Sequence, residues 1–330
     1  SNLTDQEQCD ALVASTAKHK VHGIFVFAQM IYVIPSMMFV KFLLVAIMCG
    51  INSKKRYASI FFTLIAMAAW TAVLCHLPRA VFEFIGKKPS LFCPTFKALS
   101  QPTYWLDIYV YILQVWDTLR ILAATLIVLY RFHSYIDVHA AKRLWEAHIP
   151  LIIGATIVLP MVIFVPIWST PSRAVIVDAE MVFENEGFIV FNKEAMHCFV
   201  CAICALIVIV SEAYLIATKR HATAEVDYAL DLIGKVEMVA IVIYALFQVV
   251  PFFARHHVPS RFHYSSLLVS DALGFAPLWA LYFICRNIRE DATPFRSLFA
   301  KCCKCCRLDP AKSQKDIDAE SELFKAIIYI

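Results

Sequence analysis

The sequence contains few charged residues and very few glycines. Asp, Glu, Lys and Arg make up 17% of the 330 residues, against about a quarter in ordinary soluble domains, and only seven residues are glycine. Transporters usually contain paired helices broken by Gly and Pro within internal repeats. No such duplication is visible, so this composition disfavours both a soluble enzyme and a transporter.

Long apolar runs replace the missing polar sequence. A helix needs about 20 apolar residues to cross a bilayer, and lipid cannot satisfy the peptide groups of an open strand. Seven segments meet this requirement or come near it: 23–50, 59–77, 104–130, 148–168, 195–218, 232–253 and 265–285. They predict an all-α membrane protein, a seven-transmembrane helix bundle. No room remains for a catalytic domain, so we expect no enzyme activity.

The ends of the chain suggest its orientation. We expect 1–22 to be an extracellular N-terminus, 23–286 the seven-helix domain and 287–330 a cytoplasmic tail. Asn2 begins an Asn-x-Thr glycosylation sequon, which is used only on the luminal side. The first apolar run is too long for the core of a signal peptide, so we expect it to stay as the first span. The basic tail favours the same orientation, although the loop charges favour it only weakly.

The sequence lacks the residues that several other classes of seven-helix protein require. A retinal-linked rhodopsin needs a Schiff-base Lys in the last span, and 265–285 contains none. An intramembrane metal site needs several converging His or acidic ligands, whereas His76 is essentially the only histidine expected within a span. We therefore expect no cofactor and no metal.

Short motifs follow one another in a recognisable order along the spans. They are Tyr32-Val33-Ile34-Pro35-Ser36, Tyr57-Ala58-Ser59-Ile60-Phe61-Phe62, Leu159-Pro160, Glu186-Gly187-Phe188, Val269-Ser270-Asp271-Ala272-Leu273, Pro277-Leu278-Trp279, and the closing Arg286 and Arg289. This pattern resembles the nematode serpentine chemoreceptors of the SRG superfamily, with the SRG and SRV groups most similar. One departure is Leu129-Tyr130-Arg131 at the end of the third span, where the family usually reads Asn-Arg.

The resemblance implies a G-protein-coupled chemosensory receptor. Its implied partners are an extracellular small molecule, such as an odorant or pheromone, a heterotrimeric G protein and the lipid bilayer, with no role for nucleic acid. Its implied location is the plasma membrane of a sensory cilium. The alternatives are a receptor for an internal peptide or amine and, from a different class, a transporter or channel.

Polar residues form a stripe on the third span. Asp107, Tyr111, Gln114, Thr118 and Thr125 fall within about a third of the helix circumference. Such a stripe can hydrogen-bond to neighbouring helices, line a ligand pocket, or do both. We predict a pocket between the third, fifth, sixth and seventh spans. Its expected polar contacts are Tyr104, Asp107, Tyr111, Gln114, Tyr244 and Gln248, and its expected apolar walls are Trp116 and Phe247.

Charged residues within the spans are the next candidates. Asp117 and Arg120 lie one helical turn apart and are expected to neutralise each other or to meet partners on other helices. The candidate partners are Lys41, Glu212, Glu237 and Asp271. These charges could serve structural pairing or a conformational switch. Pro277, with Gly274 nearby, is the preferred hinge, and simple helix curvature is the alternative.

Basic residues follow the inner end of the third span. Arg131, Lys142, Arg143 and Trp145 predict a surface for G-protein coupling, and the alternative is ordinary anchoring by positive charge.

Twelve cysteines divide by their expected location. Cys93 with Cys198 is the favoured disulfide, and Cys93 with Cys9 is the competing pair. In the tail, Cys302, Cys303, Cys305 and Cys306 predict palmitoylation beside a short amphipathic eighth helix over 289–300. A zinc site and a disordered tail are the alternatives.

Overall fold

The computed structural model describes part of the chain. The described residues are 31–42, 60–86, 104–169, 172–177, 180–185, 193–218, 228–253 and 260–284. The predicted N-terminal segment with its sequon at Asn2, the tail with its four clustered cysteines and eighth helix, and both Cys9 and Cys93 lie outside them. The interpretations that depend on those residues therefore stay predictions.

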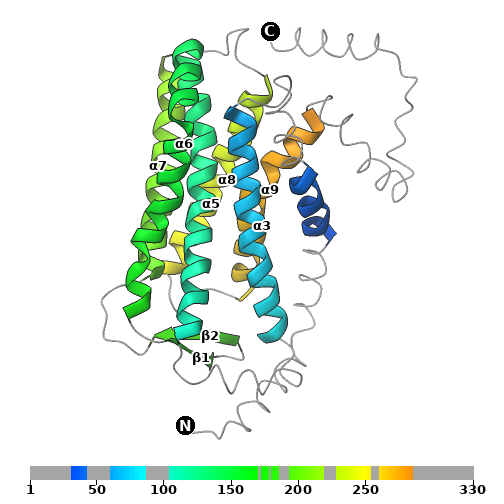
Figure 1. Ribbon diagram of the computed structural model, residues 1–330, viewed down its shortest axis with the longest axis vertical. Coiled ribbons are helices and arrows are strands. Elements are labelled where there is room, and N and C mark those ends of the chain that lie inside the picture. The colour runs from blue at the N-terminus through cyan, green and yellow to red at the C-terminus, as the bar shows by residue number, and fades with distance from the viewer. Residues whose placement is uncertain are drawn as a thin grey trace, which may run out of the picture. The chain divides into compact units, whose positions relative to one another are not determined.

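Seven helices occupy the described residues, as the apolar runs predicted. They are Ile31–Phe42, α3 (Ile60–Gly86), α5 (Tyr104–Ile136), α6 (Val138–Ile163), α7 (Lys193–Ala217), α8 (Tyr228–Phe253) and α9 (Ser260–Ile284) (Figure 1). Four stretches are long and apolar enough to cross a membrane: Tyr104–Ile136, Val138–Ile167, Ala195–Ala217 and Leu230–Val250. The apolar stretches described in the other three helices are shorter. The chain is a multi-pass helical membrane protein.

A short hairpin interrupts the helical pattern after α6. The 3₁₀ turn η1 (Val165–Ser169) is followed by β1 (Ser172–Val177) and β2 (Glu180–Asn185), which pair antiparallel with Val175 opposite Val182. No strand was predicted between the spans 148–168 and 195–218. The stretches Ala174–Val177 and Met181–Phe183 are rich in β-branched and apolar residues, which favour strands over turns.

Helix α5 is central to the packing of the bundle. It contacts α3, α6, α7, α8 and α9, while α8 also packs against α7 and α9 (Figure 1). Its apolar stretch is more buried than those of α6, α7 and α8. This position explains why α5 carries the polar stripe, because a polar face on a membrane helix must meet protein rather than lipid.

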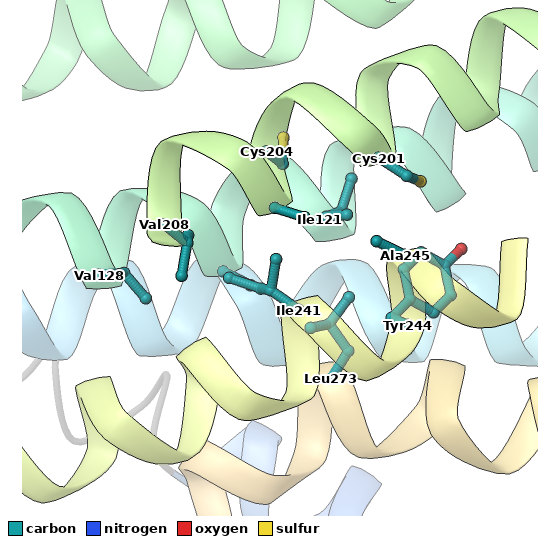
Figure 2. Close-up of a cluster of buried hydrophobic side chains, with 11 residues drawn as sticks. Ile121, Val128, Cys201, Cys204, Val208, Ile241, Tyr244, Ala245 and Leu273 are labelled. Atoms are coloured by element: carbon teal, nitrogen blue, oxygen red, sulfur yellow. The ribbon is translucent and has the colours of Figure 1, made fainter. Parts of the chain in front are cut away.

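The inner faces of four helices meet in one apolar cluster. Ile121 and Val128 of α5 contact residues from α7, α8 and α9 there (Figure 2). The other labelled members are Cys201, Cys204, Val208, Ile241, Tyr244, Ala245 and Leu273. The opposite face of α7 exposes Leu206 and Val210, as expected for side chains in contact with lipid.

The connection between α5 and α6 is a single residue. Helix α5 continues to Ile136, and Asp137 caps α6 by accepting the Ala140 N–H at 2.9 Å. This hydrogen bond stabilises the carboxylate and lowers the pKa of Asp137. The apolar runs predicted that one span ends near 130 and the next begins near 148, but the segment between them is helical instead of a loop.

Gly274 marks a close approach of α9 to α3. A Cβ atom at this position would overlap the Cβ of Ala72, which is itself fully buried. A loosened hinge beside Pro277 was predicted for Gly274 and stays a prediction. The structure shows that the missing side chain of Gly274 lets the two helices pack together.

We expect Gly274→Ala to lower the unfolding free energy by about 1–3 kcal/mol, because the added methyl group forces α3 and α9 apart. Thermal unfolding of receptor in lipid nanodiscs would measure this change. Gly154→Ala is the matched control. A Cβ at Gly154 meets nothing within 4 Å, so this substitution should leave stability unchanged or raise it slightly. Equal effects of the two substitutions would contradict the packing role of Gly274.

Candidate functional site

Arg120 is the centre of a buried polar cluster in the bundle. Its side chain is fully buried, and Nη2 contacts the Asp117 Oδ1 atom at 2.5 Å and the Ser270 hydroxyl. Its Nη1 atom lies 4.0 Å from the Asp271 Oδ1 atom of α9. The expected pairing of Asp117 with Arg120 is therefore present, and of the candidate partners on other helices Asp271 is the one that joins it.

Two more helices add hydrogen bonds to the same cluster. The Tyr32 hydroxyl donates to Asp271 Oδ2 at 2.6 Å, and His76 Nδ1 lies 3.3 Å from Asp271 Oδ1. The Cys75 thiol donates to Asp117 at 2.9 Å. We call Tyr32, His76, Asp117, Arg120, Ser270 and Asp271 the central cluster. It connects the first described helix, α3, α5 and α9.

A second chain of contacts continues from Arg120 toward α7. The guanidinium carbon of Arg120 lies 5.8 Å from the centre of the Tyr244 ring. The Tyr244 hydroxyl is 3.0 Å from His197 Nε2, and His197 Nδ1 is 2.9 Å from the Thr118 hydroxyl. His197 was not predicted as a site residue. Its signal in the sequence was a histidine near the N-terminal end of an otherwise apolar span.

The C-terminal end of α5, which is predicted to be its inner end, carries a separate group of ion pairs. Arg131 is almost fully buried; its Nη1 atom lies 2.6 Å from Glu212 of α7, and its Nε atom lies 2.9 Å from Asp231 of α8. Asp231 also accepts hydrogen bonds from Tyr135 at 2.5 Å and Lys235 at 2.7 Å. We call Arg131, Glu212 and Asp231 the inner ion-pair cluster.

Close helix packing supports this inner cluster. A Cβ atom at Gly234 of α8 would overlap the Cδ of Arg131, so only glycine leaves room for the arginine stem. Glu212 was predicted as a partner for Asp117 and Arg120, and that prediction is wrong. Glu212 lies near the C-terminal end of α7, where it pairs with Arg131. Asp231 was missed, because it lies just before the predicted start of its span.

The expected basic and aromatic surface is only partly exposed. Trp145 is buried, with Nε1 3.3 Å from His133 Nδ1 and its ring 5.3 Å from that of Tyr130. Its expected place on a surface is therefore wrong, because α6 continues as a helix that packs this side chain against α5. Lys142 and Arg143 are exposed.

The expected ligand contacts are in different environments. Tyr104 is 64% exposed, while Trp116, Phe247 and Gln248 are partly buried. The Tyr111 hydroxyl donates to the Met161 carbonyl of α6 at 2.9 Å and so points toward the fourth span. Tyr244 is buried in its contact with His197.

Asp107 is buried and Gln114 is partly buried, and both have buried acceptor atoms without a donor among the described residues. Neither carboxylate oxygen of Asp107 has a hydrogen-bond partner among the described residues, and neither has Gln114 Oε1. Asp107 is 1% exposed.

The remaining candidate charges lie away from the central cluster. Lys41 is exposed, and Glu237 is fully buried with no hydrogen-bond partner for either oxygen within the described part of the chain. Pro277 lies inside α9, and a hinge role for it stays a prediction. Cys198 is partly buried and donates to the Gln248 carbonyl at 3.2 Å, and its pairing with Cys93 also stays a prediction.

A comparison with known families gives a match over most of the chain. The sequence profile described as "Srg family chemoreceptor" matches residues 26–292, which include every described helix. No curated protein matches the chain significantly.

Proposed function

The chain belongs to the Srg family of chemoreceptors, and on that premise we propose that it is a G-protein-coupled receptor. In this proposal an extracellular small molecule binds in the outer half of the bundle and activates a heterotrimeric G protein at the inner end. The N-terminus lies outside the cell, and the receptor works in the plasma membrane of a sensory cilium.

The inner ion-pair cluster carries this proposal. One arginine of α5 holds an acid from α7 and an acid from α8. These bonds are short and charge-assisted, and they link the inner ends of three helices. Breaking them would let α7 and α8 separate from α5 and would free Arg131 for a partner. A bundle that can exist with these ion pairs formed or with them broken has the two states that a receptor needs for switching.

The chain of contacts above supports a route from the ligand to this end. His197 and Tyr244 lie in the outer halves of α7 and α8, and Tyr244 covers Arg120 in the central cluster. A ligand that displaces Tyr244 therefore changes the contacts of a buried arginine, which in turn contacts α9 through Ser270 and Asp271. Energetic coupling between two distant sites can be carried by a continuous chain of side-chain contacts of this kind, if the chain has two discrete arrangements.

Ligand-dependent nucleotide exchange tests the function directly. Receptor in lipid vesicles with purified Gα and Gβγ should accelerate GTPγS binding when an active compound is added. Arg131→Ala at equal receptor density should abolish this acceleration. Exchange that is unaffected by any compound, together with compound-dependent uptake or current, would replace the proposal with a transporter or channel.

The internal-ligand alternative concerns the source of the ligand rather than the mechanism. Expression confined to ciliated sensory neurons supports chemosensation. Expression in internal tissues without sensory endings would favour a receptor for an internal peptide or amine.

A further inference from the structure

Two buried acceptors on the outer half of α5 have no donor. They are the Asp107 carboxylate and the Gln114 side-chain carbonyl, and no described residue donates a hydrogen bond to them. Buried polar atoms in proteins are paired in the large majority of cases, and a buried unpaired carboxylate is especially unfavourable. Two such groups on one helix face indicate a site that is completed by a donor from outside the described residues.

Helical geometry places these acceptors on one side of α5. Seven residues separate Asp107 from Gln114, which is nearly two turns, or about 10 Å along the axis. Thr118 follows one turn later on the same face and contacts His197 of α7, which contacts Tyr244 of α8. The acceptors thus lie in a row that ends at the hydrogen-bonded group Thr118, His197 and Tyr244.

Apolar side chains border this row. Val110 and Val115 of α5 pack against Phe164 and Ile167, and Met196 of α7 lies against the same group. A ligand at this place would therefore meet oxygen acceptors on one side and hydrocarbon on the other. Sites of this composition bind small organic molecules with a few polar groups.

Among the described buried residues of this half of the bundle, acids outnumber arginines. Asp107, Asp117 and Asp271 are buried acids, and Arg120 is the buried arginine that accompanies them. Asp117 and Asp271 contact Arg120, and Asp271 also contacts His76. Asp107 has no cation within the described residues. The excess of negative charge favours a cationic ligand group.

We propose that this receptor binds a ligand with a protonated amine, whose N–H groups donate to Asp107, on an apolar body that lies along Val110 and Phe164. A second donor on a longer ligand reaches Gln114. The inference rests on the proposed function, because it specifies the ligand class of the same receptor.

Thermal unfolding of the receptor in nanodiscs tests this without a G protein. The probes are hexylamine and 2-phenylethylamine, each compared with the alcohol of the same carbon skeleton, hexan-1-ol and 2-phenylethanol. The amines should raise the unfolding temperature of the wild type more than their alcohols. Asp107→Asn should raise the amine concentration needed for half of this shift by at least about 30-fold, and Asp107→Glu should keep part of the response.

A matched substitution separates this site from general effects of charge. Glu146→Gln removes an exposed acid on α6 and should leave the amine response unchanged. 6-Aminohexan-1-ol should lose affinity in Gln114→Leu, whereas hexylamine should not. Amines that stabilise no better than alcohols, or that act equally on Asp107→Asn, would overturn the proposal. Amine binding without nucleotide exchange would contradict the proposed function alone.

Discussion

Glu212→Gln and Asp231→Asn are each expected to raise ligand-independent nucleotide exchange by about ten- to a hundredfold. Each substitution removes one charge-assisted bond from Arg131, and such hydrogen bonds contribute about 1.5–3 kcal/mol. The bonds hold α7 and α8 against α5, at 2.6 Å for Glu212 and 2.9 Å for Asp231. Their loss should shift the population toward the open inner end. GTPγS binding without added compound measures the shift.

Glu146→Gln is the control for the loss of an acid near the inner end. Glu146 and Lys142 are both exposed and 3.9 Å apart, and exposed pairs of this kind contribute little. Basal exchange should therefore stay at the wild-type level. If Glu212→Gln and Asp231→Asn also leave basal exchange unchanged at equal receptor density, the inner ion-pair cluster does not restrain activation.

Arg120→Met should lower the unfolding free energy by about 3–5 kcal/mol, because it leaves two buried acids without their arginine. Asp117 and Asp271 are both almost fully buried, and the Arg120 guanidinium lies between them. The unfolding temperature in nanodiscs and the amount of receptor at the cell surface should both fall clearly.

A triple variant separates lost charge pairing from lost packing. Adding Asp117→Asn and Asp271→Asn to Arg120→Met removes the unpaired charges and keeps similar side-chain volumes. Such replacement of buried ions is often neutral, so most of the stability should return. A triple variant as unstable as Arg120→Met would show that the shape of Arg120, rather than its charge, matters.

Helix-forming segments could be predicted from the sequence because the bilayer permits few alternatives. Runs of about 20 apolar residues must satisfy their own backbone hydrogen bonds, so α5, α7 and α8 follow from hydropathy. Their ends were less certain. Helix α5 continues six residues beyond its predicted end, since Asp137 caps the next helix in place of a loop.

Contacts within one helix were also accessible from the sequence. Asp117 and Arg120 are three residues apart, and helical geometry alone brings such side chains together. The polar stripe on α5 likewise required only the helical period. Neither argument could say which neighbouring helix each side chain meets.

The sequence by itself determined that this is a seven-helix membrane protein with buried charges on α5. Only the tertiary structure decided the partners of those charges. It placed Glu212 beside Arg131 instead of Arg120, brought Asp231 into the same cluster and buried Trp145. It also left Asp107 without a hydrogen-bond partner among the residues that it describes. The physical reason is that hydropathy and helical period describe each helix alone, whereas the contacts between residues about 100 positions apart depend on how the helices are rotated and packed.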